Sequence, residues 1–319
     1  MSAITCFPGT WAPYELSITT SIISVTLAVT ACSGNLLVII SVIKDPKLQT
    51  PFNYFLTNLA VSDFLFGAIA LPISTYVHYK ESRRELSIPL MQAVHMSYFI
   101  AATASLLSLI ALSIDRFIAI VYAARYKCIV SPKRSHFASF MIWLVSLTVP
   151  FVYFKLGMIN YLMFFANTVL VIGLFLLIVI YARVYNFLQR QSKEMRQHLN
   201  LSRAVDLDKL ALKKVLLEKK IAGVFITILL VYILTYLPAI VMVYTLHYCT
   251  QCNCILRHVF RDGQFWLISL HCAVNPFICT IRLKHFKRAI VRLFGCLSRN
   301  KVATNEFINT QTSIDMQAL

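Results

Sequence analysis

Charged residues are scarce in this 319-residue chain, where they make up 13% of the sequence, about half the share usual in soluble proteins. Acidic residues are the rarer kind, 13 against 30 Lys and Arg. Glycine and proline are also few, 8 and 10, which excludes a low-complexity chain. Hydrophobic residues account for 58%. This composition excludes a cytosolic enzyme and a free nucleic-acid-binding protein, so we expect a membrane protein with no nucleic acid among its partners.

Signatures of catalysis are missing as well. The sequence has no P-loop, no metal-ligand triad and no nucleophile-elbow pattern, so we do not expect an enzyme. It also lacks the alternating segments of about ten residues that build membrane β-barrels. No internal repeat is visible, which counts against transporter folds made of paired halves.

Seven apolar segments are long enough to cross a hydrocarbon layer about 30 Å thick, which takes about 20 residues of helix. They predict an all-α membrane protein, a bundle of seven transmembrane helices. The first 14 residues have no basic start, so we expect no cleavable signal peptide. The segments lie near residues 17–43, 53–77, 89–122, 136–154, 157–188, 221–247 and 259–281.

Most Lys and Arg residues lie between alternate segments, and the positive-inside rule then places the N-terminus outside and the C-terminus in the cytosol. We expect an extracellular N-terminus at 1–16, a seven-helix domain at 17–281 and a cytosolic tail at 282–319. The third cytosolic loop is expected at about 189–212. Apolar residues recur every three to four positions across 186–220, which predicts that helices five and six continue into the cytosol. The basic surface also suits anionic membrane lipid or an acidic partner.

One carboxylate, Asp63, lies near the middle of the second segment, where an ionisable group is costly unless it has a partner or a function. Asn35, Ser105 and Asn275 lie at comparable depth, and such oxygen-bearing side chains suit a small hard cation such as sodium. A water-bridged polar cluster that only packs the helices is the alternative. A seven-helix ion or proton translocator using Asp63 and His271 is a third interpretation. It lacks a continuous file of acids through the bundle.

At the cytosolic end of the third segment stands Asp115-Arg116-Phe117, and Glu218 lies at the start of the sixth. Arg116 can pair with Asp115 and, if the two helix ends meet, with Glu218. A helix shift can open or close such a pair. Taken alone, the DRF tripeptide indicates only an arginine that extends its charge to the membrane interface.

Seven short motifs lie on successive apolar segments in a characteristic order. They are Gly34-Asn35, Asn58–Asp63, Ser105–Phe117, Trp143, Tyr181, Leu237-Pro238 and Asn275–Cys279. Together they resemble the rhodopsin-like (class A) G-protein-coupled receptors, over about Leu16–Phe294. The resemblance implies a plasma-membrane receptor that transmits an extracellular ligand signal to a heterotrimeric G protein by outward movement of helix six. It also implies arrestin and receptor kinases as partners.

The resemblance assigns roles to residues one by one. The polar group around Asp63 looks like the family's sodium and water site, with no other cofactor expected. Asp115, Arg116 and Glu218 look like its ionic lock, with Arg116 turning toward the G protein on activation. The further switch positions are Tyr181, Pro238 (the kink of helix six), Asn275 and Pro276.

Other positions carry the family pattern only in part. Residues from Phe286 to Arg292 look like the amphipathic eighth helix, with Cys296 beside it as a candidate palmitoylation site. Tyr236 replaces the usual tryptophan two residues before the helix-six proline, and Cys279 replaces the tyrosine of NPxxY. We therefore expect altered basal activity or efficacy.

Four of the nine cysteines lie on the predicted outer side: Cys6, Cys249, Cys252 and Cys254. They allow three complete pairings, and the closely spaced Cys252 and Cys254 are not expected to join each other. Zinc binding by Cys249 and Cys252 is the alternative. Met91 stands where most of the resembled family has a cysteine on helix three. This feature and a nearly absent second outer loop are similar to the melanocortin, lysophospholipid, cannabinoid and adenosine receptors.

The expected ligand pocket is mostly apolar, which suits a lipid or another hydrophobic small molecule. Tyr98 stands where amine receptors have an aspartate, which argues against a monoamine. Glu81, Glu85 and Asp262 are expected on loops and are too few to hold a basic peptide. Simple packing of the bundle and proton sensing by outer histidines are the alternatives. The pocket residues are Tyr98, Phe99, Ala102, Tyr236, Val243, Phe265 and Ser269, with His95 and His247 near the rim.

Overall fold

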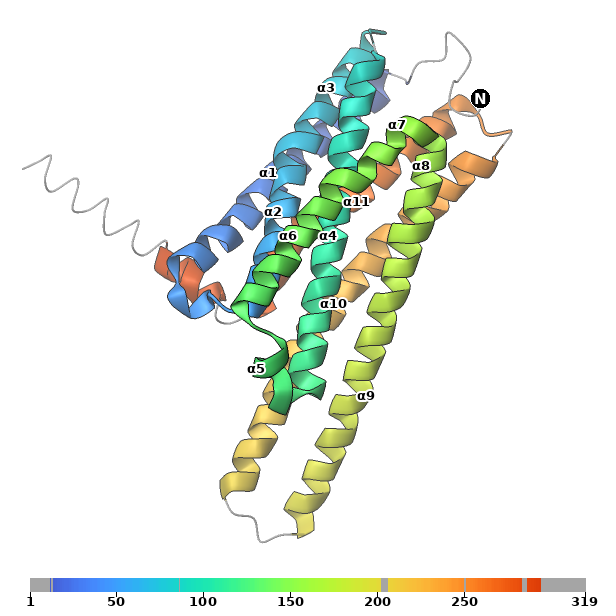
Figure 1. Cartoon of the computed structure of the whole chain (residues 1–319). Coiled ribbons are helices and arrows are strands. Elements are labelled where there is room, and N and C mark those ends of the chain that lie inside the picture. The colour runs from blue at the N-terminus through green and yellow to red at the C-terminus, as the bar shows by residue number, and fades with distance from the viewer. Residues whose placement is uncertain are drawn as a thin grey trace, which may run out of the picture.

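Seven long helical segments lie side by side in the computed structural model of the chain (Figure 1). Short interruptions divide three of them into shorter helices. The structure describes residues 12, 14–85, 87–201, 206–249, 251–282 and 286–293.

The elements follow the predicted segments closely. The first four segments are α1 (Tyr14–Lys44); α2 (Pro51–Leu65), η2 (Phe66–Ala70) and α3 (Leu71–Ser82); α4 (Ile88–Val121); and α6 (Pro132–Thr148), η4 (Val149–Val152) and α7 (Tyr153–Leu156). The last three are α8 (Met158–Phe165), η5 (Ala166–Val171) and α9 (Ile172–Leu201); α10 (Asp206–Tyr248); and α11 (Cys254–Arg282). The connections include η1 (Pro46–Leu48), η3 (Ala123–Arg125) and α5 (Tyr126–Ile129).

Local sequence signals set several of the helix ends. Thr50 caps α2 and Ser131 caps α6, each accepting a hydrogen bond from a backbone N–H of the first turn, and a proline follows each cap. Gly157 separates α7 from α8 with φ at +77°, a left-handed conformation that glycine adopts without steric cost. This single residue confirms that the connection between the fourth and fifth segments is almost absent.

The third segment, α4, lies in the middle of the bundle. It contacts α2, α6, α9 and α10, while α1 packs against α2, α3 and α11, and α10 packs against α9 and α11. One continuous hydrophobic core joins these helices, and its fully buried members include Leu59, Phe66, Phe99, Leu106 and Tyr232. The arrangement confirms the predicted seven-helix bundle.

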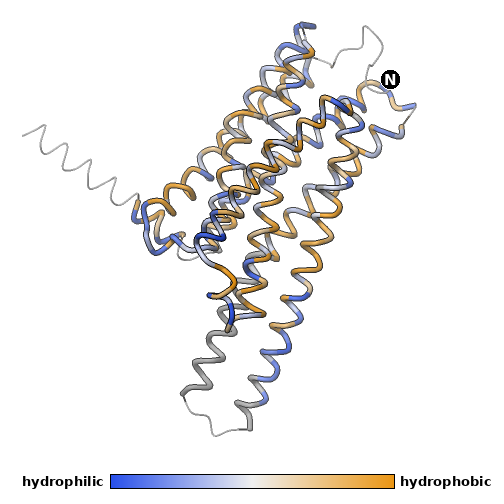
Figure 2. The backbone as a smooth tube through the Cα atoms, in the orientation of Figure 1, coloured by the Kyte–Doolittle hydropathy of each residue, from blue (hydrophilic) through white to orange (hydrophobic). Residues whose placement is uncertain are grey.

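The outer surface of the bundle is apolar, as a lipid-facing surface requires. Figure 2 shows hydrophobic residues along the middle of the helices. Large side chains such as Phe140 and Leu234 are 61% and 70% exposed there. Six segments of the described chain are long and apolar enough to cross a membrane. The seventh, α11, is more polar and packs between α1 and α10.

Helices α9 and α10 extend well beyond the other helices at one end of the bundle (Figure 1). The expected loop at 189–212 is helical apart from 202–205, which lie outside the described residues. Apolar residues recur every three to four positions in this segment, and this pattern predicted that helices five and six continue into it. Residues 286–293 are also helical, with Phe286 buried against the core, as expected for the eighth helix.

Candidate functional site

Most of the functional side chains lie at the two ends of the bundle. The Glu81 end is where α3 ends and α11 begins, and the Arg116 end is where α9 and α10 extend. A cavity of about 140 Å³ lies at the Glu81 end, lined by residues of α3, α4, α8, α10 and α11. The predicted pocket residues that line it are Tyr98, Phe99, Val243 and Phe265, together with His95 and His247.

Aromatic rings form much of the cavity wall. Tyr98 stacks on Phe265 with ring centroids 5.5 Å apart, and Phe99 meets Tyr161 edge-on at 4.6 Å. Methionine side chains complete the apolar surface, which the sequence analysis did not foresee because Met91 was considered only as a missing cysteine. The cavity methionines are Met91, Met158 and Met163.

Three expected pocket residues, Ala102, Tyr236 and Ser269, do not line the cavity. Ala102 and Ser269 each lie one helical turn beyond a lining residue and are buried in the bundle. Tyr236 stacks on Tyr232 at 4.2 Å and meets His271 edge-on at 5.3 Å. Hydropathy does not tell how deep within the bundle a helical residue lies. The sequence therefore could not separate residues that line the cavity from residues that pack below it.

Glu81 and Asp262 correct a second expectation. Instead of lying on loops, Glu81 belongs to α3 and Asp262 to α11, and they are only 2% and 3% exposed. Both oxygens of Glu81 accept hydrogen bonds from Arg261, at 3.0 and 2.8 Å. Asp262 Oδ1 accepts another from Arg261 Nε at 2.7 Å. Helix α3 is thereby joined to α11 by a buried guanidinium.

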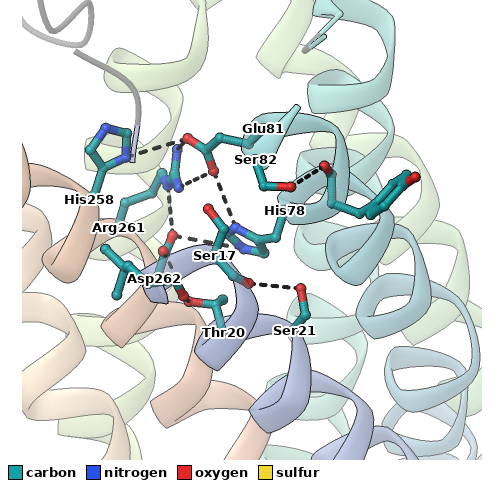
Figure 3. A network of polar contacts seen from close by, with 11 residues as sticks. Ser17, Thr20, Ser21, His78, Glu81, Ser82, His258, Arg261 and Asp262 are labelled. Carbon is teal, nitrogen blue, oxygen red and sulfur yellow. Dashed lines mark hydrogen bonds and ion pairs between the residues drawn. The ribbon is translucent and has the colours of Figure 1, made fainter. Parts of the chain in front are cut away.

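Two histidines complete this ionic cluster, which we define as His78, Glu81, His258, Arg261 and Asp262. His78 Nδ1 and His258 Nδ1 lie 3.3 and 3.5 Å from the Glu81 oxygens, and His78 Nε2 lies 3.9 Å from Asp262 Oδ1 (Figure 3). All except Glu81 line the cavity. Sequence reasoning placed Glu81 and Asp262 on separate loops, because their proximity depends on how α3 packs against α11.

Glu85 does lie between helices, as expected. It is exposed and pairs with Lys80 at 2.8 Å. The hydrogen bond from Lys80 lowers the pKa of Glu85. An exposed pair of this kind adds little stability, so Glu85 stays a surface charge outside the ionic cluster.

Asp63 lies in the centre of the bundle and is completely buried. Ser105 donates a hydrogen bond to Oδ1 at 2.9 Å, and Asn275 donates one to Oδ2 at 2.7 Å. Asn35 instead donates to the backbone oxygens of Ala31 and Cys272, so it joins α1 to α11. Three of the four predicted residues therefore meet.

Arg116 forms the expected ion pair with Asp115, whose side chain is buried. Asp115 Oδ1 accepts a second hydrogen bond from Tyr126 at 2.9 Å. The guanidinium of Arg116 lies over the ring of Phe52, 4.1 Å from its centroid. The side chain of Glu218, in α10, lies outside the described residues, so the second half of the lock stays a prediction. Sequence reasoning missed Tyr126 and Phe52, which come from other elements.

The other switch positions have identifiable contacts. The hydroxyl of Tyr181 on α9 lies 2.8 Å from that of Ser113 on α4. Pro238 and Pro276 lie inside α10 and α11. At Gly34 a Cβ atom would lie 2.6 Å from the Pro276 ring, so glycine is needed for the close approach of α1 to α11.

Three of the four outer cysteines are disulfide-bonded. Cys249 joins Cys252, which rules out the zinc interpretation of this pair. Cys254 is also disulfide-bonded. Cys6 and the candidate palmitoylation site Cys296 lie outside the described residues.

Comparison with known proteins gives a family for this arrangement. The sequence matches the family described as 7 transmembrane receptor (rhodopsin family) at residues 34–158 and 153–278. It is 24% identical to the histamine H2 receptor of Cavia porcellus, over 88% of this chain and 80% of that receptor. It is also 24% identical to the Canis lupus familiaris histamine H2 receptor, over 93% and 85% of the two chains. The Homo sapiens alpha-1D adrenergic receptor is 26% identical, over 85% of this chain and 55% of the receptor.

Proposed function

Because the chain belongs to the rhodopsin family of 7 transmembrane receptors, we propose that it is a receptor for a small, predominantly hydrophobic molecule that binds at the Glu81 end. Receptors of this family respond to an extracellular ligand and signal through G proteins, and a translocator is not favoured. The observation that carries the proposal is the cavity, whose walls are mainly aromatic, methionine and aliphatic side chains.

The Glu81 end faces outward in this proposal. The disulfide between Cys249 and Cys252 lies at this end, and disulfides persist in the oxidising exterior. The basic parts of α9 and α10 lie at the opposite end, as the positive-inside rule requires of the cytosolic side. The N-terminus is then extracellular and the C-terminus cytosolic. A G protein, arrestin and receptor kinases meet the Arg116 end, and palmitate on Cys296 anchors the segment after the eighth helix.

A closer affinity to the melanocortin, lysophospholipid, cannabinoid and adenosine receptors is part of the proposal. The support for it is Met91 on α4 and the single-residue connection at Gly157. Tyr98 faces the cavity where an amine receptor has its aspartate. The relatives above are named as histamine and adrenergic receptors. The ligands in those names are ligands of those proteins.

Packed side chains connect α10 with α11 and with the buried Asp63 in the middle of the bundle. The Tyr232 and Tyr236 rings on α10 pack against His271 of α11, which lies 3.3 Å from Asn275 and so next to Asp63. Pro238 removes one backbone hydrogen bond from α10 and permits bending there. We propose that a ligand that bends α10 makes Arg116, on α4, available to the G protein.

Asp63, Ser105 and Asn275 are the residues that would hold a sodium ion. Their oxygen atoms suit a hard cation, and the buried Oδ1 of Asn275 has no hydrogen-bond partner among the described residues. Asp63→Asn is expected to erase the sodium dependence of basal nucleotide exchange on the G protein. A wild-type receptor that shows no response to sodium at physiological concentrations would favour the purely structural polar cluster.

A matched pair of valines on α10 tests the cavity. Val243 lines it and is 3% exposed, whereas Val241 faces away from the bundle and is 58% exposed. A panel of hydrophobic small molecules is screened in cells with several G-protein readouts. Val243→Trp fills the cavity and should abolish the response to any active compound, while Val241→Trp should leave it unchanged. Equal responses of the two variants at matched surface expression would contradict binding in this cavity.

A further inference from the structure

We infer that the ligand of this cavity is an uncharged alcohol, whose hydroxyl group binds to uncharged polar side chains on the wall and whose hydrophobic part lies against the aromatic rings. The inference rests on the proposed function and names the chemical class of its ligand. Two observations carry it. The charges around the cavity are balanced, and three buried polar side chains on its wall have no hydrogen-bond partner among the described residues.

The charged side chains around the cavity are equal in number. Glu81 and Asp262 contribute two carboxylates, which both bind the guanidinium of Arg261 (Figure 3). Arg257, which also lines the cavity, contributes the second guanidinium and donates to two backbone oxygens between α10 and α11, at 2.8 and 3.3 Å. With neutral histidines the set has no net charge. Burying an uncompensated charge is costly, so the cavity favours an uncharged ligand over an ammonium or a carboxylate.

Three uncharged polar side chains lie on the cavity wall, each from a different helix. Ser74 on α3, Tyr98 on α4 and Gln264 on α11 all line the cavity, and each is 9% exposed or less. The two hydroxyl groups make no hydrogen bond to any described residue, and neither does Gln264 Oε1. Most buried polar groups in proteins are paired, so an unpaired set beside a cavity indicates that a bound molecule or water completes it.

Neighbouring hydroxyl groups show how such groups are normally satisfied in these helices. Thr75, next to Ser74, donates to a backbone oxygen one helical turn earlier, at 2.9 Å. Ser97, next to Tyr98, does the same at 2.9 Å. A hydroxyl group in an apolar helix usually pairs with its own backbone in this way. The hydroxyl of Ser74 does not, so it remains available to a group in the cavity.

An alcohol matches both the balanced charge and the unpaired polar groups. A hydroxyl group donates one hydrogen bond and accepts two, and it carries no charge. It can donate to Gln264 Oε1 and accept from the hydroxyl of Ser74 or Tyr98. A hydrocarbon of the same shape would leave these groups unpaired, and an ether would supply no donor for Gln264.

The size and apolar walls of the cavity determine the rest of the ligand. The cavity volume of about 140 Å³ is close to that of an apolar protein cavity, roughly 150 Å³, that holds one benzene ring. Tyr98, Phe99 and Phe265 offer ring faces and edges for such a group. A phenyl ring on a short alkyl alcohol is therefore a suitable probe.

The experiment compares four probes of similar shape on the purified full-length receptor in lipid nanodiscs at pH 7.5. The probes are 3-phenylpropan-1-ol, the hydrocarbon butylbenzene, 3-phenylpropylamine and 3-phenylpropanoate, and their binding is measured by thermal stabilisation. The alcohol is expected to bind more tightly than the amine and the acid, because neither charge finds a free counter-charge in the cavity. Comparison with butylbenzene isolates the contribution of the hydroxyl group, since the two molecules differ only in a hydroxyl and a methyl group.

A triple variant that combines Ser74→Ala, Tyr98→Phe and Gln264→Leu removes the unpaired polar groups and keeps the wall apolar. It should weaken binding of the alcohol by roughly 2- to 13-fold for each hydrogen bond lost, from the usual strength of a bond between uncharged groups, and it should not weaken butylbenzene. The single variants identify the group that holds the hydroxyl, and they serve as the test if the triple variant does not fold. The control Thr75→Ala, outside the cavity, should leave binding of the alcohol unchanged.

Three results would overturn the inference while leaving the hydrophobic cavity in place. They are an amine that binds more tightly than the alcohol, an acid that does so, and a set of variants that weakens the alcohol no more than butylbenzene. In the last case the polar groups hold only water. Binding of all four probes that survives Val243→Trp, or no binding of any probe, would contradict the proposed pocket as well.

Discussion

Replacing Tyr126 by phenylalanine is expected to raise the basal activity of the receptor. The Tyr126 hydroxyl donates a 2.9 Å hydrogen bond to Asp115, the carboxylate that holds Arg116. Burial and the nearby Asp115 carboxylate raise the pKa of Tyr126 to about 12, so the phenol remains a donor at physiological pH. Without the hydroxyl, one oxygen of the buried Asp115 carboxylate loses a hydrogen-bond donor in the receptor whose Arg116 is paired with Asp115.

The size of the effect follows from the strength of this bond. A hydrogen bond to a charged group contributes about 1.5–3 kcal/mol. If the bond forms only while Arg116 is held by Asp115, its loss shifts the ratio of open to closed receptor roughly 10- to 150-fold. A receptor that is active for about 0.1% of the time would then be active for about 1–13%, which is readily detected as basal signalling.

Basal nucleotide exchange on a panel of G proteins, measured at several expression levels, is the assay. Tyr122→Phe is the matched control, because Tyr122 is exposed and its hydroxyl makes no hydrogen bond to the described residues. Tyr122→Phe should behave like the wild type. Unchanged exchange in Tyr126→Phe at equal surface expression would refute the reasoning, since the Tyr126 bond would then be equally strong in the open and closed receptor.

Two further predictions concern coupling and packing. Arg116→Ala should abolish G-protein activation while leaving surface expression largely intact, and undiminished exchange at matched expression would contradict the role of Arg116. Gly34→Ala should destabilise the receptor by about 1–3 kcal/mol, because its Cβ would meet the rigid Pro276 ring at 2.6 Å. Gly223→Ala is the control, since its Cβ would meet no atom within 4 Å, and a lower thermal midpoint for Gly34→Ala alone is the expected result.

The number and positions of the helices were predictable because the hydrocarbon core of a membrane offers the backbone no hydrogen-bond partners. A segment of about 20 apolar residues must satisfy its own N–H and C=O groups, and a helix does so without a partner strand. The predicted segments 17–43 and 89–122 thus agree with α1 and α4 within three residues. Within the expected third cytosolic loop at 189–212, α9 runs to Leu201 and α10 begins at Asp206, as the apolar periodicity of 186–220 predicted.

The polar sites were predictable only in part. Asp63 was identified from its isolation among apolar residues, and Arg116 from its place beside Asp115 at a helix end. The partners of Arg116 outside its own helix, Phe52 and Tyr126, were missed because no local pattern relates residues on different elements. Asn35 was expected at Asp63, but it contacts the backbone of α11, because the rotation of α1 decides which group its side chain reaches.

By itself, therefore, the sequence determined what must cross the membrane and which charges in it need a partner. Those conclusions depend on the cost of exposing polar groups to hydrocarbon, which acts on each segment separately. Only the tertiary structure decided that Glu81 and Asp262 share Arg261, and that Ser269 packs below the cavity instead of lining it. Such contacts depend on the rotation, tilt and depth of each helix, which are set by the packing of all seven together.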